Sequence, residues 1–193
     1  MSPSPNQNEK WLLRPLSEEP IQAYIGKHLR AIGICKQVIA QIGACHVWVS
    51  SYSTSEDFLR GIRLMRQRGE VLTSSLVIDT KAAAKIVKLS HLARNAFDHV
   101  YLGMNHSKVM LFENDGARVV VLTSMNQTYG SRAESTVFIS DDRAYNVIKM
   151  GMDQIINQAM EYGLHTGTDC KDRGTGGGIE PDPGHFRPFG FEW

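Results

Sequence analysis

The hydrophobic positions of the chain follow two periods in alternation, one helical and one extended. From Ser17 to Gly43, isoleucine and leucine recur every three or four residues, and Ser17 precedes acidic residues and a proline that are typical of a helix start. This pattern predicts a long helix over residues 17–43. The run CHVWVSSY that follows is rich in β-branched and aromatic residues and predicts a buried strand.

The same alternation continues as far as the run HVYL. A cap at residues 54–55 opens a second helix, with Phe58, Ile62 and Met65 on its inner face. The strand VLTSSLVID, a helix that begins at Thr80 and the short strand HVYL come next. Helices and strands in alternation imply parallel strands that are joined by right-handed crossovers.

Beyond His106 the pattern changes to that of a hairpin. The runs HSKVMLFE and RVVVLTS flank a turn of Asn, Asp and Gly, residue types that tolerate turn conformations. STVFIS predicts another strand, and Asp141 is expected to cap a long last helix that ends at Gly163. The sequence therefore predicts an α/β fold with a mixed, largely parallel sheet and helices on both faces.

Composition divides the chain into three parts. Residues 1–16 are polar and contain prolines, which predicts a flexible N-terminal arm, and residues 17–163 carry the periodic pattern of one domain. Residues 164–193 are rich in Gly and Pro and predict a tail without regular structure. Two interpretations of this tail stay open, a disordered segment or one that docks on its own domain, a twin subunit or another protein. Docking is suggested by its aromatic residues Phe186, Phe189, Phe191 and Trp193.

Charge and cysteine content narrow the class of protein. The 21 basic and 20 acidic residues nearly cancel, so no overall field marks the chain as a binder of nucleic acid or membranes. Three cysteines without CxxC spacing argue against a disulfide framework or a zinc ribbon. No apolar run has the length of a signal peptide core or a membrane span. We therefore expect a soluble cytoplasmic protein.

The hairpin carries a group of polar residues that suits phosphate chemistry. Side chains two residues apart on a strand share a face, so His106 and Lys108 are expected to point the same way. Ser124 and Asn126 have the same spacing on the facing strand. An ammonium, a hydroxyl and an amide together can bind the oxygens of a phosphate diester. Imidazoles titrate near neutral pH and can act as nucleophile or proton donor.

These residues resemble the signature of the phospholipase D superfamily, in which HxK precedes an acid and then a Gly-Ser and Asn element. HSK at 106–108, Glu113 and TSMN at 123–126 match that order, and Glu134 lies where the family has a later glutamate. The resemblance covers about residues 21–160 and is most similar to the small bacterial endonucleases that carry a single copy of the motif. The family has such an α/β fold.

The sequence departs from the family pattern at two positions. Glu113 replaces the usual aspartate, and Asp115 is a second candidate for that acid. Thr123 replaces the glycine before the serine. Neither change removes a group that takes part in the family's chemistry.

The resemblance implies a metal-independent phosphodiesterase that needs no cofactor. His106 would attack phosphorus to give a phosphohistidine, and a second histidine would protonate the leaving oxygen. Because one chain supplies one such histidine, the resemblance implies a homodimer in which the second is His106 of the twin subunit. Lys108 would neutralise the phosphate, Ser124 and Asn126 would bind its oxygens, and Glu134 would orient the imidazole.

Further residues are candidates for support and substrate binding. Glu113 and Tyr52 are expected near the site in supporting roles. Arg60, Arg63 and Lys81 lie on two predicted helices and either follow a phosphate backbone or form solvated helix faces.

Three functions stay open. The first is a nonspecific endonuclease, which the basic helices and the lack of an amphipathic membrane-docking segment favour. The second is a phospholipase or phosphatidyl transferase with the same chemistry. The third is a noncatalytic module that binds nucleic acid or a protein partner.

Overall fold

The structure is a computed structural model that describes residues 13–27, 29–128 and 132–161. Its strands are β1 (Ile21–Gly26), β2 (Cys45–Ser51), β3 (Val71–Asp79), β4 (His99–Gly103), β5 (Val109–Glu113), β6 (Arg118–Thr123), β7 (Glu134–Ile139) and β8 (Met160–Glu161). Its helices are α1 (Ala31–Ile42), α2 (Glu56–Gln67), the 3-10 helix η2 (Thr80–Ala82), α3 (Ala83–Lys88), α4 (Ser90–Ala96) and α5 (Asp142–Gln158). The predicted C-terminal tail lies outside the described residues.

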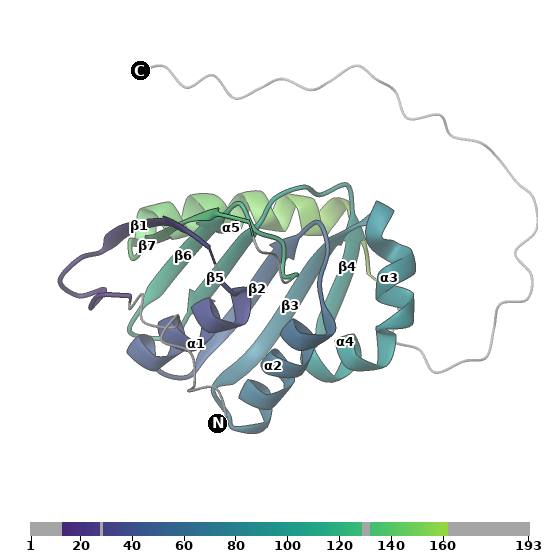
Figure 1. Ribbon diagram of the computed structural model, residues 1–193, viewed down its shortest axis with the longest axis horizontal. Coiled ribbons are helices and arrows are strands. Elements are labelled where there is room, and N and C mark those ends of the chain that lie inside the picture. Colours follow the sequence, from purple (N-terminus) through teal and green to yellow (C-terminus); the bar gives the residue numbers. More distant parts are fainter. Residues whose placement is uncertain (1–12, 28, 129–131, 162–193) are drawn as a thin grey trace, which may run out of the picture.

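The strands form a single mixed sheet in the order β1-β7-β6-β5-β2-β3-β4-β8 (Figure 1). The pairs β2–β3 and β3–β4 are parallel, as the alternation of helices and strands predicted. The predicted hairpin is the antiparallel pair β5–β6, and β7 and β1 extend it in antiparallel steps. The α/β fold with a mixed sheet is confirmed, although fewer of its pairs are parallel than expected.

The predicted helix over 17–43 is wrong in its first half. Residues 21–26 form β1, which pairs with β7 from Ile21 opposite Ile139 to Gly26 opposite Glu134, and the helix begins only at Ala31. The segment IQAYIG also alternates with a period of two, so it fits a strand as well as a helix. Pairing with β1 satisfies the backbone N–H and C=O groups along the outer edge of β7. This tertiary interaction favours the strand over the helix for residues 21–26.

Two other helix boundaries differ from the prediction. The helix expected from Thr80 is divided into η2, α3 and α4, with Leu89 between the last two. The last helix has the predicted cap, since the Asp141 side chain accepts a hydrogen bond from the backbone N–H of Ala144, 2.7 Å away. It ends at Gln158 rather than Gly163, because the chain then turns to pair with β4.

Part of the expected N-terminal arm is packed. The backbone N–H groups of Leu13 and Leu16 donate to the side chains of Gln37 and Gln41 on α1, at 2.7 and 2.8 Å. Both leucine side chains are buried. Residues 13–16 of the expected arm are therefore packed on α1, and residues 1–12 lie outside the described residues.

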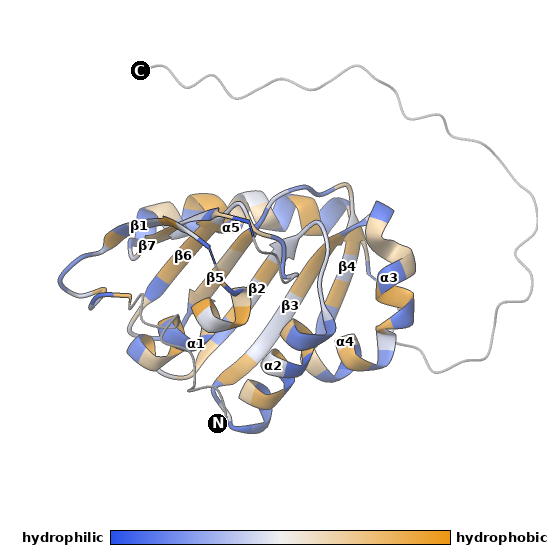
Figure 2. Cartoon of the chain, in the orientation of Figure 1, coloured by the Kyte–Doolittle hydropathy of each residue, from blue (hydrophilic) through white to orange (hydrophobic). Residues whose placement is uncertain are grey.

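Helices cover both faces of the sheet, as expected (Figure 1). On one face, α1, α2 and α4 pack on side chains such as Met110 and Phe112, and on the other α5 packs on Leu111 and Val120. Strands are hydrophobic over most of their length, whereas hydrophobic and hydrophilic residues alternate along the helices (Figure 2). A Cβ at Gly61 would lie 2.3 Å from Ile32, so this glycine allows α1 and α2 to approach closely. No helix among the described residues is long and apolar enough to cross a membrane.

The topology brings several chain segments to one edge of the sheet. Ser50 at the end of β2 lies opposite Val109 at the start of β5, and Val109 lies opposite Leu122 near the end of β6. Thr123 in turn lies opposite Thr136 near the start of β7. This edge of the sheet therefore brings together the carboxyl ends of the parallel strands, the start of β5 and the end of β6. Binding and catalytic sites commonly form at this edge in α/β sheets.

Candidate active site

His106 and Lys108 lie together in the segment that leads from β4 to β5. The Lys108 ammonium lies 3.2 Å from Nδ1 of His106 and donates to the His106 backbone carbonyl at 2.8 Å. The His106 side chain is exposed, and Lys108 is half-buried. An anion at this point could therefore contact the imidazole and the ammonium at the same time.

Tyr52 adjoins the imidazole from the end of β2. The centroid of its ring lies 5.3 Å from that of His106, and the ring planes are inclined by 57°. This is the tilted contact that aromatic rings prefer over face-to-face stacking. The tyrosine thus limits the positions that the exposed imidazole can take.

Ser124 and Glu134 form a second pair on the other side of the edge. The Ser124 hydroxyl donates a short hydrogen bond to the Glu134 carboxylate and accepts from the backbone N–H of Ser135 at 3.0 Å. Glu134 was expected to orient the His106 imidazole. Within the residues that the structure covers, its carboxylate bonds instead to Ser124, so any effect on His106 would have to come through a ligand.

Asn126 and Thr123 tie this pair to the neighbouring strands. The Asn126 Oδ1 atom accepts a long hydrogen bond of 3.4 Å from the hydroxyl of Ser51, at the end of β2. The Thr123 backbone N–H donates to the Lys108 carbonyl at 3.0 Å, which joins the two halves of the site. Its hydroxyl, which the glycine of the family lacks, donates to the Ser135 carbonyl at 3.0 Å. Thr123 therefore strengthens the connection between β6 and β7.

Glu113 lies apart from these residues. It follows Lys108 by five positions along extended chain, a span of about 17 Å. Its carboxylate accepts hydrogen bonds from Arg118 at 2.8 Å and from the buried Tyr145 hydroxyl at 3.0 Å. Partial burial alone would raise the pKa of Glu113, but the hydrogen bonds from Arg118 and Tyr145 lower it below its usual value. Asp115 is exposed in the adjacent turn, two residues further along the chain from Lys108.

The basic candidates differ in their surroundings. Arg60 on α2 is exposed and forms an ion pair with Glu56 at 2.6 Å. Arg63 is half-buried, one turn further along the same helix. Lys81 has an exposed side chain directly after β3, at the same edge as His106. Of the three, Lys81 is best placed to meet a ligand at the site.

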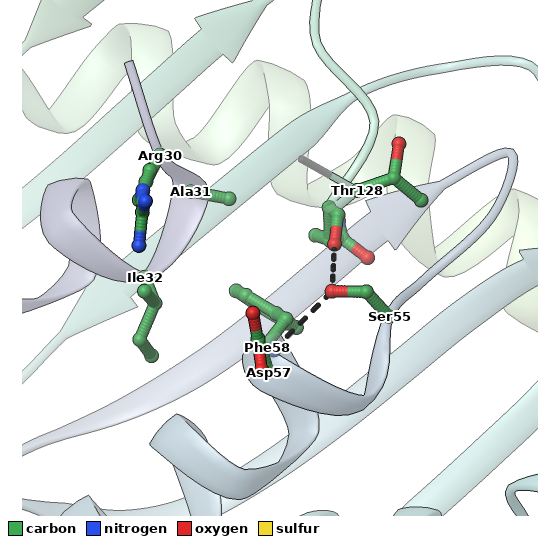
Figure 3. A pocket seen from close by; sticks show the side chains of 8 residues that line it. Arg30, Ala31, Ile32, Ser55, Asp57, Phe58 and Thr128 are labelled. Atoms are coloured by element: carbon green, nitrogen blue, oxygen red, sulfur yellow. Dashed lines mark hydrogen bonds between the residues drawn. The ribbon is translucent and has the colours of Figure 1, made fainter. Parts of the chain in front are cut away.

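A small pocket beside the site was not predicted (Figure 3). The Ser55 hydroxyl accepts from the Phe58 backbone N–H at 3.3 Å, which caps α2, and donates to the Gln127 carbonyl at 2.6 Å. Arg30 and Thr128 complete the lining from the start of α1 and the segment after Asn126. Segments so far apart in sequence gave no signal for this pocket. In the described residues, no group of three or more His, Cys, Asp or Glu side chains could hold a metal ion.

Sequence comparisons find neither a matching family model nor a matching curated protein. Solved structures do match. Nuc, a phospholipase D family member from Salmonella typhimurium, has a TM-score of 0.56 and 19% identity over 74% of this chain and 98% of its own. NucT from Helicobacter pylori has a TM-score of 0.54 and 16% identity over 74% and 99%. Phosphatidylserine synthase from Haemophilus influenzae Rd KW20 has a TM-score of 0.53 and 11% identity over 73% and 39%.

These likenesses establish the fold. The chain is an α/β protein with the phospholipase D fold, as the residues around His106 led us to expect. It spans nearly the whole length of the two small proteins and less than half of the synthase.

Proposed function

We propose that this protein is a metal-independent phosphodiesterase that cleaves nucleic acid at a site shared by two copies of the chain. The observation that carries the proposal is the contact between His106 and Lys108, 3.2 Å apart, at the same sheet edge as Ser124 and Glu134. A nucleophile, a cation and a hydroxyl donor are the groups that phosphoryl transfer through a covalent intermediate requires.

The reaction has two steps. The His106 imidazole attacks phosphorus, a P–N bond forms, and the P–O bond to the leaving group breaks while an imidazolium donates its proton to the leaving oxygen. The imidazolium belongs to a second histidine, which is neutral after this donation. In the second step this neutral imidazole takes a proton from water, and the water oxygen attacks phosphorus and breaks the P–N bond. Lys108 turns its ammonium from the histidine to the phosphate oxygens, and Ser124 donates to another of them.

The second imidazole is supplied by His106 of a second copy of the chain. An apolar surface beside the site suits such a copy. Ile21 and Ile25 on β1 are 68% and 79% exposed, and Gly26 at the end of β1 pairs with Glu134. Ile21 lies opposite Ile139, which packs on the α5 side of the sheet, so both isoleucines face that side. Burying them against a twin would remove apolar area from water and bring the two sites together.

Nucleic acid is the proposed substrate because Lys81 at the site edge and Arg63 on α2 offer positive charge to a flanking phosphate backbone. The test is a side-by-side assay of a labelled oligonucleotide and phospholipid vesicles, with excess EDTA. We expect cleavage of the oligonucleotide that persists in EDTA. Turnover of the phospholipid alone would support the lipid alternative, to which the fold match with a phosphatidylserine synthase points.

The shared site is tested separately by sedimentation. Ile25→Lys should place a charge in the dimer surface, convert a dimer to monomers and abolish cleavage at low protein concentration. Leu72→Lys is the matched control, because Leu72 is 51% exposed near the start of β3, far from this edge. An active monomer in either protein contradicts the shared site.

A further inference from the structure

Asn105, directly before His106, is a buried polar residue at an otherwise exposed edge. Only 4% of its surface is exposed, whereas its neighbours Met104 and His106 are exposed. Burial of a polar side chain is costly unless its hydrogen bonds are made. Its partners therefore indicate why an amide occupies this position.

The Asn105 amide closes a ring of hydrogen bonds with two serines. Its Nδ2 group donates to the Ser50 hydroxyl at 2.8 Å, and its Oδ1 atom accepts from the Ser107 hydroxyl at 2.6 Å. The two hydroxyls are also in hydrogen-bond contact. Since Ser50 accepts from the amide and Ser107 donates to it, Ser50 is the donor between the hydroxyls. The ring needs one donor and one acceptor at position 105.

The same residue fixes the backbone on both sides of His106. The Ser107 N–H donates to the Asn105 Oδ1 atom at 3.0 Å, and the Asn105 N–H donates to the buried Asp79 carboxylate at 3.0 Å. The second carboxylate oxygen of Asp79 accepts from the Lys81 N–H at 2.7 Å. The segment that carries His106 is thus attached to the ends of β2 and β3.

We infer that Asn105 is a positioning residue that holds His106 in the orientation for attack on phosphorus, an inference that depends on the proposed function. Misplacement of a catalytic group by about 1 Å can cost about 100-fold in rate. Loss of the Asn105 ring should therefore lower kcat and leave KM nearly unchanged, because Lys108 and Ser124 still bind the phosphate.

Asn105→Asp gives this inference a pH signature. An ionised carboxylate only accepts hydrogen bonds and cannot complete the ring, whereas a protonated carboxyl supplies one donor and one acceptor, like the amide. The charged or titratable groups around position 105 are Asp79 from β3 and His106 and Lys108 from its own segment; Ser50 and Ser51 from β2 are neutral. Burial and Asp79 disfavour ionisation of the new carboxyl, and Lys108 favours it.

The experiment compares kcat of Asn105→Asp with that of the parent from about pH 8 to about pH 5. At about pH 8 we expect kcat of Asn105→Asp to be about 100-fold below that of the parent. The ratio of variant kcat to parental kcat should rise as the pH falls. Asn95→Asp, an exposed asparagine on α4, introduces the same charge away from the site and should keep a flat ratio near one. A variant with parental kcat at every pH, or with a loss that does not change with pH, overturns the inference.

Hydrogen exchange separates this inference from the proposed function. In Asn105→Ala the Ser107 N–H loses its side-chain acceptor, so the Ser107 amide should lose protection, while amides of the buried core, such as Ile34, keep theirs. If Asn105→Asp does not fold, Ser107→Ala breaks the same ring at a half-buried position and should show a smaller loss of kcat. A parent that cleaves no diester refutes the proposed function alone, and an unchanged Ser107 amide refutes the positioning role alone.

Discussion

Both ends of the β5–β6 hairpin carry basic and acidic side chains, but the two ends differ in the exposure and the partners of these side chains. At one end, His106, Lys108 and the Ser124–Glu134 pair lie at an open edge, with the imidazole exposed. At the other end, Glu113 is bonded to Arg118 and to Tyr145, which α5 contributes from one face of the sheet. The first end leaves its imidazole exposed to solvent, whereas the second pairs its charges internally. Glu113 is therefore close to His106 and Lys108 in sequence but lies outside the candidate site.

This difference predicts opposite effects for substitutions at the two ends of the hairpin. Changes at the open end should affect turnover and leave stability nearly unaltered, because exposed groups contribute little to the free energy of folding. Changes at the closed end should affect stability and leave turnover unaltered, because they remove partly buried hydrogen bonds about 17 Å from Lys108.

The largest effect is expected from His106→Ala. In the proposed mechanism this substitution removes both the nucleophile and the proton donor, so kcat should fall at least about 10⁴-fold. The melting temperature should stay within a few degrees of the parent's. His46→Ala is the matched control, since His46 lies opposite Glu113 on β2 and should keep the parental kcat. Steady-state cleavage of the labelled oligonucleotide checks both, and parental turnover by His106→Ala contradicts the mechanism.

Lys108→Ala should have the next largest effect. In the proposed mechanism Lys108 stabilises the charge on the transferring phosphate, so its removal should reduce kcat/KM by about 100- to 1000-fold. Lys108→Arg should recover part of this loss, because it keeps the charge and changes the geometry. At the closed end, Arg118→Ala should leave kcat/KM unchanged. Equal losses in Lys108→Ala and Arg118→Ala would remove the distinction between the two ends.

A smaller effect, on stability alone, is expected from Glu113→Gln. The free energy of unfolding should fall by about 1–2 kcal/mol, because the Arg118 and Tyr145 hydrogen bonds lose a charged acceptor. Urea unfolding at neutral pH measures this difference, and kcat should match the parent's. A loss of turnover without a loss of stability would place Glu113 in the site after all.

The stabilisation by Glu113 should also depend on pH in a defined direction. Its pKa is lower in the folded protein than the ordinary value of 4.5, so the folded state favours the ionised carboxylate. The contribution is therefore fully present above that value and is lost as the pH falls through the folded-state pKa. The difference in unfolding free energy between the parent and Glu113→Gln should shrink in that range. A difference that grows with acidification contradicts the assigned hydrogen bonds.

The elements that could be predicted from the sequence are those with one dominant period. The parallel strands β2, β3 and β4 and the β5–β6 hairpin followed from local patterns and turn residues. The segment 21–26 did not, because IQAYIG fits both periods and its partner β7 lies more than 100 residues away. Contacts at that separation leave no local signal.

The candidate site could be predicted in part for the same reason. His106 and Lys108 are two residues apart, and the sequence predicted that they point the same way, although both lie in the segment before β5 and not on the predicted strand. The bond from Ser124 to Glu134 and the ring of Asn105, Ser50 and Ser107 join different strands and depend on the sheet order. Polar residues at strand ends, such as Ser50 and Asp79, were the available signal for that ring.

The covalent intermediate tests the central claim most directly. Labelled oligonucleotide is mixed with the parent protein, quenched during turnover in alkaline denaturant, and examined for label attached to the polypeptide by peptide mapping. We expect a phosphoramidate adduct on His106 that is absent from His106→Ala and unchanged in His46→Ala. Rapid turnover with no labelled polypeptide, or with label on a residue other than His106, would contradict the account.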